Sequence, residues 1–215
     1  MKIAINGAGI AGPALAYWLL HHGHEPVLIE KAPALRSGGY VVDFWGSGYD
    51  IAEKMGILPR LLEAGYEVGE VRFVDTHGKK SGGFPTDVFS RMTRGRFTSL
   101  QRSDLAAAIY SAIDGKVETL FGDSIASVDE AADHTHVGFD HAQSRDFDLV
   151  IGADGLHSRV RSLVFGEEAE FERFLGYNVA AFELTGYRPR DELAYVSHAL
   201  AGRQADGAID EVEML

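Results

Sequence analysis

In the first thirty residues, two short runs of apolar residues flank a segment whose apolar residues have the spacing of a helix. Residues 2–6 have an apolar centre, which predicts a short buried strand. Residues 13–22 follow with a helical pattern, and Pro13 suits a first turn because its missing N–H costs nothing there. Residues 26–30 are again apolar. A strand, a helix and a second strand in this order predict a parallel pair joined by a right-handed crossover.

The rest of the chain predicts a mixture of helices and strands. Helices are expected at 48–55, 58–64, 103–113 and 156–164, and strands at 67–76, 96–101, 147–152 and 177–185, with two or three more strands within 117–140. Residues 31–50 are expected to be largely irregular. Gly78 and Gly82-Gly83 are expected to mark turns, and Ser103 to cap a helix. This mixture indicates an α/β fold.

Composition and charge exclude several classes of protein. The 215 residues are 46% hydrophobic and 24% charged, unlike a disordered or collagen-like chain. Cysteine is absent, which excludes disulfides, thiolate zinc sites and a cysteine nucleophile. A net charge of −12 argues against general nucleic-acid binding. No apolar run reaches the ~18 residues of a membrane span, so no membrane association and a cytoplasmic location are expected. The nine histidines form no H-E-x-x-H motif, and no metal site is expected.

The residues between the first strand and the first helix match a glycine-rich phosphate-binding turn. Residues 7–12 read Gly-Ala-Gly-Ile-Ala-Gly, which fits G-x-G-x-x-G. Gly7 allows the tight turn, Gly9 lets the backbone approach a pyrophosphate, and Gly12 lets the helix pack close to the strand. The helix N-terminus attracts phosphate through its unpaired N–H groups. We therefore predict that Gly7, Gly9, Ala11 and Gly12 bind a dinucleotide cofactor.

Glu30 ends the second predicted strand and adds an acid to this unit. Its carboxylate can accept hydrogen bonds from both hydroxyls of a ribose, and it would repel a 2′-phosphate. The first nucleotide is therefore expected to be FAD or NAD rather than NADP. The alternative is a structural glycine turn with Glu30 at a solvated strand end. The unit by itself does not separate FAD from NAD.

A second motif follows the strand predicted at 147–152, where the sequence reads Gly-Ala-Asp-Gly before an arginine-containing helix. Asp154 can cap that helix, position a cofactor, or do both, because the two roles are compatible. Arg102 can offer up to five donors to phosphate or flavin oxygens, or be a surface arginine at a helix start. Arg159 and Arg161 are expected to be structural or to form a cationic rim for a pyridine nucleotide.

In chain order, these motifs resemble those of the FAD-dependent aromatic hydroxylases, the single-component flavoprotein monooxygenases. That family carries G-x-G-x-x-G, an R-x-x-L helix start similar to the segment at Arg102, and a D-G motif of the form seen at Asp154. The resemblance implies that Glu30, Lys31 and Arg36 lie beside the cofactor. Residues 39–46 are most similar to the branch containing tetracycline-inactivating monooxygenases. In that branch an aspartate, here Asp43, lies close to the flavin.

The resemblance also implies a fold and an activity. Residues 1–72 and 96–165 would form a Rossmann-like FAD-binding domain with a parallel sheet, residues 73–95 and 166–203 part of a β-sheet substrate domain, and residues 204–215 an acidic tail. FAD is the expected cofactor and NAD(P)H the co-substrate. Oxygen would pass from a flavin C4a-hydroperoxide to an aromatic or polyketide-like small molecule. No side chain is predicted to be catalytic, because the flavin carries the chemistry.

The chain is short for this family, whose members carry a further Gly-Asp motif late in the sequence. The sole Gly-Asp pair here is Gly122-Asp123, within a predicted hairpin. We expect a truncated chain. The alternative is a naturally short member, which would imply a complementing partner chain. Two other functions remain open: a non-catalytic fragment that binds FAD incompletely, and an NAD-dependent dehydrogenase.

Overall fold

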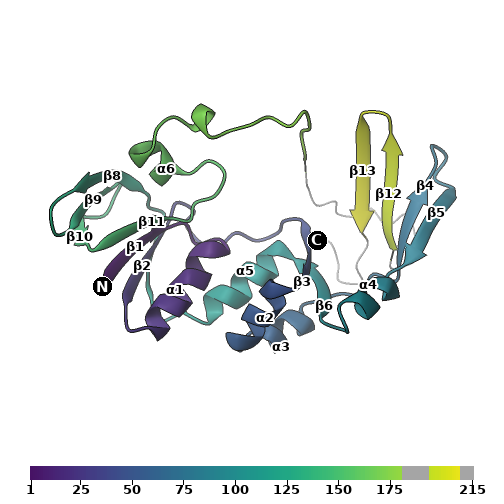
Figure 1. Cartoon of the computed structure of the whole chain (residues 1–215), viewed down its shortest axis with the longest axis horizontal. Helices are drawn as coiled ribbons and strands as arrows, with labels where there is room; N and C mark the ends of the chain where they lie inside the picture. The colour runs from purple at the N-terminus through teal and green to yellow at the C-terminus, as the bar shows by residue number, and fades with distance from the viewer. Residues whose placement is uncertain (181–193, 209–215) are drawn as a thin grey trace. The chain divides into compact units, whose positions relative to one another are not determined.

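The computed structural model describes residues 1–180 and 194–208, which divide into two compact units (Figure 1). Unit 1 comprises residues 1–37 and 105–179. Unit 2 comprises residues 38–104 with the described part of 180–215. The two units are defined by contacts between residues. The domains predicted from the sequence are defined by their expected functions, and their boundaries remain a prediction.

Unit 1 is built on a parallel sheet with the strand order β11-β1-β2-β7. Its strands are β1 (Lys2–Asn6), β2 (Glu25–Glu30), β7 (Glu118–Phe121) and β11 (Leu149–Gly152). Helix α1 (Ala11–His21) connects β1 to β2 and begins two residues before the predicted start. Asn6 pairs in register with Ile29 of β2 and Gly152 of β11, so the carboxyl ends of three strands meet at one edge. The predicted α/β fold with a parallel sheet is confirmed.

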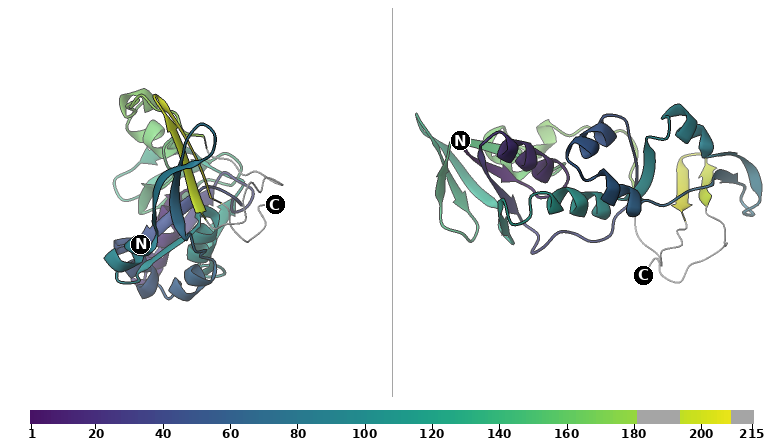
Figure 2. Two further views of the ribbon diagram at one scale, coloured as in Figure 1. Left: turned by 90° about the vertical axis from the view of Figure 1, so that its right-hand side faces the viewer. Right: turned by 90° about the horizontal axis from the view of Figure 1, so that it is seen from below.

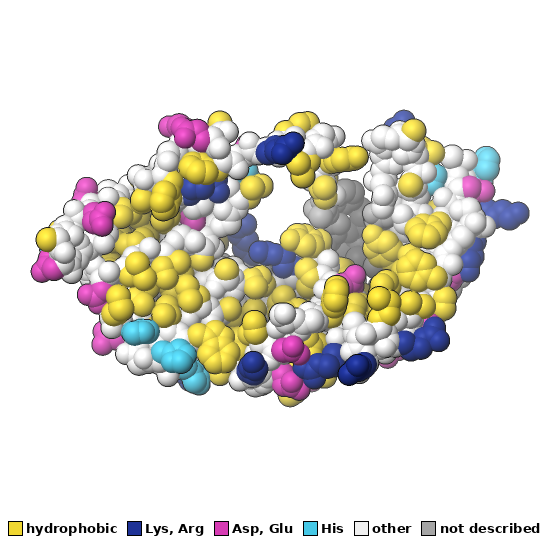
Figure 3. Space-filling view, in the orientation of Figure 1, with side chains coloured by type: hydrophobic (Ala, Val, Ile, Leu, Met, Phe, Trp, Pro, Cys, Tyr) yellow, Lys and Arg dark blue, Asp and Glu magenta, His cyan; other side chains and the backbone are white. Residues whose placement is uncertain are grey.

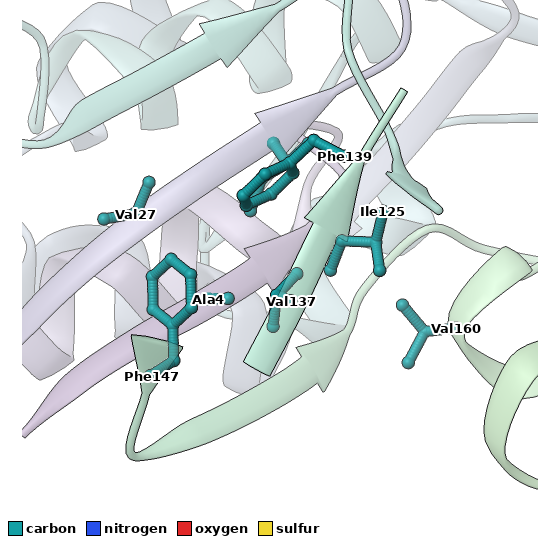
Figure 4. Close-up of a cluster of buried hydrophobic side chains, with 8 residues drawn as sticks. Ala4, Val27, Ile125, Val137, Phe139, Phe147 and Val160 are labelled. Carbon is teal, nitrogen blue, oxygen red and sulfur yellow. The ribbon is translucent and has the colours of Figure 1, made fainter. Parts of the chain in front are cut away.

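The two faces of this sheet are covered by different layers. One face packs on α1 and on the turn that follows α5 (Arg102–Ser111), through Ile3, Ile5, Leu28, Ala16 and Ile113. The other face packs on the antiparallel strands β8 (Ile125–Glu130), β9 (Thr135–Phe139) and β10 (Arg145–Phe147), through the cluster drawn in Figure 4. Because both faces are covered, the strands are apolar at nearly every position.

The chain leaves β11 through two short helical segments. Helix α6 (Arg159–Val164) adds Val160 to the core cluster of unit 1. A single 3₁₀ turn, η1 (Glu168–Glu170), follows it. Helix α6 begins later than the predicted residue 156, because Ser158 occupies its N-cap and accepts a hydrogen bond from the Arg161 N–H.

The described residues of unit 2 form two sheets and three short helices. Strand β3 (Val41–Trp45) pairs antiparallel with β6 (Phe97–Gln101). The second sheet has the order β13-β12-β4-β5 and consists of β4 (Glu70–Val74), β5 (Lys80–Pro85), β12 (Ala194–Leu200) and β13 (Arg203–Ala208) (Figure 2). Strands β4 and β12 run parallel. The helices are α2 (Ser47–Lys54), α3 (Leu58–Glu63) and α4 (Asp87–Met92).

Several predicted elements of unit 2 were wrong. Strand β3 lies in a stretch predicted to be irregular, and helix α4 was not predicted. Gly82 and Gly83 lie inside β5 and not in a turn. A Cβ on Gly83 would lie 2.3 Å from the carbonyl oxygen of Val71, so glycine there permits close approach of β4.

Three further sequence predictions also differ from the structure. Ser103 lies inside α5 and donates to Gln101 Oε1 at 3.3 Å, so it is not the helix cap. Of the strand predicted at 177–185, residues 177–180 have no regular structure and the remainder lies outside the described residues. Strand β13 occupies part of the predicted acidic tail. No helix within the described ranges has the length and hydropathy to cross a membrane.

Candidate functional site

The glycine turn between β1 and α1 leaves no room for side chains at two positions. Gly7 has a φ of 108°, and its N–H donates to the Ile29 carbonyl at 2.6 Å. A Cβ on Gly7 would lie 2.5 Å from the Ala153 oxygen, and one on Gly12 would lie 1.9 Å from the Gly7 oxygen. Both glycines are therefore required for the turn to pack between α1 and the segment after β11.

The N-terminus of α1 has no side-chain cap. Ile10 occupies the N-cap position and offers no acceptor, and the first turn contains no acidic residue. Gly9 is half-buried and Ala11 is exposed beside it. The N–H groups of the first turn thus lack a side-chain partner, and their partial positive charge is not neutralised locally. This is the arrangement that binds phosphate in dinucleotide folds.

The Glu30 carboxylate lies against the glycine turn. Its Oε2 accepts from the Ala8 N–H and its Oε1 from the Ala32 N–H, both at 2.9 Å. Each oxygen retains a lone pair for a further donor. The carboxylate therefore holds the turn next to the end of β2 and can still accept a hydrogen bond from a ligand hydroxyl.

Asp154 links the end of β1 to the N-terminus of α6. Its Oδ2 accepts from the Asn6 side-chain amide at 2.7 Å and from the Arg159 and Val160 N–H groups at 2.8 and 3.3 Å. Its Oδ1 accepts from the Ser158 hydroxyl at 2.5 Å. The predicted capping role is thus present, and it is shared with Ser158. The sequence analysis did not identify Asn6 as a functional residue. Its place as a polar residue at the end of an otherwise apolar strand was the signal that could have revealed it.

The four basic residues of unit 1 that the sequence analysis singled out fall into two groups. Lys31 and Arg36 are exposed, and neither has an ion pair or hydrogen bond within the described chain. Arg159 donates to the Ile125 carbonyl at 2.7 Å. Arg161 donates to the Leu156 carbonyl at 2.7 Å and lies over the Phe171 ring. Arg159 and Arg161 therefore have structural contacts, while Lys31 and Arg36 remain available to an anion.

Arg102 and Asp43 both belong to unit 2. The Arg102 N–H donates to the Tyr40 carbonyl at 3.1 Å, which fixes the start of α5 beside residue 40. Within the described residues, no carboxylate or carbonyl accepts from its guanidinium. Asp43 pairs in register with Ser99, whose hydroxyl donates to Asp43 Oδ1 at 2.7 Å.

The Gly122-Asp123 pair is a structural clamp. The buried Asp123 carboxylate accepts from the N–H groups of Ser124, His141 and Ala142 at 2.8 to 3.0 Å. Burial raises the pKa of Asp123, but these three hydrogen bonds outweigh it and hold the pKa below its usual value. Asp123 thereby ties the loop before β8 to the loop after β9.

No protein-family model matches the chain, but individual proteins do. An uncharacterized protein of Mycobacterium tuberculosis is 40% identical over 193 residues, which cover 88% of this chain and 51% of that protein. A flavin-dependent monooxygenase of Legionella longbeachae is 35% identical over 195 residues, which cover 87% of this chain and 48% of that protein. The chain is homologous to flavin-dependent monooxygenases. The family resemblance seen in the sequence is confirmed.

Solved structures of tetracycline destructases have the same fold. Tet(55) matches with a TM-score of 0.68 and 35% identity over 78% of this chain and 41% of its own. Tet(51) matches with a TM-score of 0.74 and 27% identity over 98% of this chain and 53% of its own. The chain spans about half the length of the curated relatives that it matches.

Proposed function

We propose that this chain is the FAD-binding part of a flavin-dependent monooxygenase. The observation that carries the proposal is the glycine turn with Glu30 against it, in a chain 35% identical to proteins named flavin-dependent monooxygenase. The turn fits a dinucleotide because glycine at positions 7 and 12 brings two backbone segments together below an uncapped helix N-terminus.

Different residues would contact different parts of the cofactor. Gly7, Gly9, Ala11 and Gly12 would hold the pyrophosphate at the N-terminus of α1, and Glu30 would accept from a ribose hydroxyl. Asp154 would act by positioning the turn through Asn6. The family resemblance adds Lys31, Arg36, Arg102 and Asp43 as proposed cofactor residues.

Bound FAD would supply the redox chemistry, with NAD(P)H as reductant and O₂ as oxidant. The proposed substrate is an aromatic or polyketide-like small molecule. An incomplete, non-catalytic FAD-binding fragment is the second candidate; the chain spans about half the length of each relative. A monooxygenase would add one oxygen atom to its substrate, whereas an incomplete fragment would release hydrogen peroxide or fail to oxidise NAD(P)H.

FAD binding by the full chain tests the proposal directly. Isothermal titration with FAD should show saturable binding, and Glu30→Gln should weaken it about tenfold, because hydrogen bonds to a charged acceptor are the strong ones. Glu25→Gln, at the opposite end of β2, is the matched control and should bind FAD like the unchanged chain. Absence of FAD binding by the full chain would refute the proposal.

Oxidation of NAD(P)H by the FAD-loaded chain then separates the two candidates. Aromatic compounds are added, products are analysed by mass spectrometry, and hydrogen peroxide is measured in a parallel reaction without catalase. A product one oxygen atom heavier supports the monooxygenase, and peroxide without such a product supports the fragment.

A further inference from the structure

The chain has two asparagines, Asn6 and Asn178, and of these Asn6 alone precedes a glycine. Asparagine is thermolabile, and it is most labile before glycine because no side chain hinders the nitrogen that follows it. Asn6 is also the last residue of β1, next to the glycine turn. We propose that Asn6 is a deamidation site at which the native fold suppresses the reaction, and that its conversion separates the glycine turn from Asp154. The proposal concerns the chain itself and does not depend on cofactor binding.

The reaction needs the chain and water alone. The backbone nitrogen of Gly7 attacks Cγ of the Asn6 side chain and closes a succinimide ring. The side-chain nitrogen takes up the Gly7 N–H proton and leaves as ammonia. Water then adds to one of the two imide carbonyls and breaks one C–N bond, which leaves aspartate or isoaspartate, and nothing is oxidised or reduced. The Gly7 nitrogen must therefore be free to reach Cγ of Asn6.

The peptide bond between Asn6 and Gly7 is fixed on both sides by neighbouring segments. The Gly7 N–H donates to the Ile29 carbonyl at 2.6 Å, and the Asn6 carbonyl accepts from the Ala153 N–H at 2.8 Å. The Asn6 side-chain amide donates to Asp154 Oδ2 at 2.7 Å, and the residue is 5% exposed. Ring closure must break the Gly7 hydrogen bond and turn the amide away from Asp154. The reaction therefore proceeds from open forms in which the end of β1 has left its neighbours.

Asn178 has the opposite arrangement. It is exposed and lies in a segment without regular structure. Val179 follows it, and this β-branched side chain hinders the nitrogen that would attack. Folding should therefore change the reaction rate strongly at Asn6 and little at Asn178, so the chain contains its own comparison.

Conversion removes the donor that joins β1 to the α6 region. In the aspartate product a carboxylate oxygen replaces the amide nitrogen that lies 2.7 Å from Asp154 Oδ2, so two negative groups face each other. In the isoaspartate product the main chain gains a methylene group directly before Gly7. The turn has no room for such a shift, because a Cβ on Gly7 would already lie 2.5 Å from the Ala153 oxygen. Both products therefore disrupt the link.

The charge of unit 1 adds to the effect of a new carboxylate. Unit 1 contains 16 acidic and 8 basic residues. Acidic side chains lie over the strands β8–β10 and over η1 on the face shown in Figure 3. Within the described residues no Lys or Arg side chain pairs with Asp154, and the guanidinium of nearby Arg159 contacts Ile125 and Asp140 instead. A second carboxylate beside Asp154 is therefore not neutralised locally.

Peptide mapping measures both asparagines in one experiment. The full chain is incubated at one mildly alkaline pH, folded and in guanidinium chloride, and conversion is followed by mass spectrometry and by release of ammonia. We expect Asn6 to convert at least about tenfold faster in denaturant, since a tenfold effect needs about 1.4 kcal/mol of opening free energy. In denaturant Asn6 should also convert faster than Asn178. Equal rates at Asn6 with and without denaturant, or an unfolded Asn6 no faster than Asn178, would overturn the proposal.

Asp154→Ala tests whether this carboxylate suppresses the reaction. It should speed conversion of Asn6 in the folded chain about threefold or more, because the amide loses a charged acceptor. Asp129→Ala, which removes an exposed acid of β8, is the matched control and should leave the rate unchanged. If circular dichroism shows that Asp154→Ala does not fold, Ser158→Ala replaces it, because that change removes one hydrogen bond of Asp154. An unchanged rate in the folded variant would refute this role of Asp154.

Asn6→Asp has the charge of one product and tests its consequence. It should lower the urea midpoint relative to the unchanged chain, because two carboxylates then face each other. Asn178→Asp makes the same change at an exposed position and should leave the midpoint where it is. Equal midpoints for the two variants would show that conversion leaves the link intact. Because the measurement is stability, a chain that fails to bind FAD would still give a clear answer.

Discussion

The side-chain amide of Asn6 donates to Asp154 Oδ2 at 2.7 Å and joins the end of β1 to the start of α6. Asn6 is 5% exposed, and Asp154 accepts three other hydrogen bonds from the α6 region. The glycine turn begins at the next residue after Asn6. The D-G motif is thus connected physically to the glycine turn, and the geometry of one depends on the other.

Removal of the Asn6 amide should destabilise unit 1. We expect Asn6→Ala to lower the free energy of unfolding by about 1–3 kcal/mol, because the half-buried Asp154 carboxylate loses a donor and the buried Asn6 side chain is truncated. Urea denaturation followed by circular dichroism measures the change. Asn178→Ala, at an exposed position, is the control and should have little effect. Equal stability of the two variants would mean that this hydrogen bond contributes nothing.

Replacing Gly12 by alanine should destabilise the fold far more than replacing Gly23 by alanine. In Gly12→Ala the added Cβ would lie 1.9 Å from the Gly7 oxygen, so α1 must move away from the turn. We expect a loss of about 3 kcal/mol or more and weaker FAD binding. Gly23→Ala is the control, because its Cβ would contact nothing within 4 Å and the cost, about 1 kcal/mol, comes from its positive φ.

Asp123 should make stability depend on acid pH. Since its folded-state pKa is lowered, its contribution is fully present above its unfolded pKa, about 3.9, and is lost as the pH falls through the folded pKa. Asp123→Asn should cost about 1–3 kcal/mol at pH 7 and flatten the acid limb of the stability profile. Urea midpoints measured from pH 7 to pH 2 test this. Asp75→Asn, which changes an acceptor in an exposed turn, should cost less and leave that limb in place.

His134 should titrate at a higher pH than a free histidine. A hydrogen bond to Asp133 at 2.7 Å raises its pKa, and the charge of Asp146 adds to the effect. Its contribution to stability is therefore present below the unfolded pKa, about 6.5, and is lost as the pH rises through the folded pKa. NMR titration of the ring C–H signal measures the value. Asp133→Asn should lower it, and Asp140→Asn should not; an unchanged value in Asp133→Asn would contradict the assignment.

Local sequence patterns correctly predicted the elements whose contacts are made by segments close together in the chain. The strand–helix–strand unit from β1 to β2 follows from an apolar run, a glycine turn and a helical pattern that adjoin one another. The roles of Gly7 and Gly12 follow from the motif because the turn needs a positive φ and close packing. The motif also placed Glu30 at the strand end beside this turn.

Elements that depend on distant partners were not predictable in the same way. Strand β3 lies between glycines and exists because β6, far along the chain, pairs with it. Strand β5 runs through two glycines because β4 approaches them closely. The partners of Asp123 and the parallel pairing of β12 with β4 likewise bring together segments that no local pattern connects.

The sequence by itself determined the parallel αβ unit, the glycine turn and the family resemblance, because each depends on residues close together in the chain. Only the tertiary structure decided that Asp154 is held by Asn6 and that Asp123 clamps two loops. It alone also brought Asp43, Trp45 and the Phe89–Phe97 stack around one pocket. Hydrogen bonds and ring contacts between distant segments form only when the sheets pack, so their partners cannot be read from spacing.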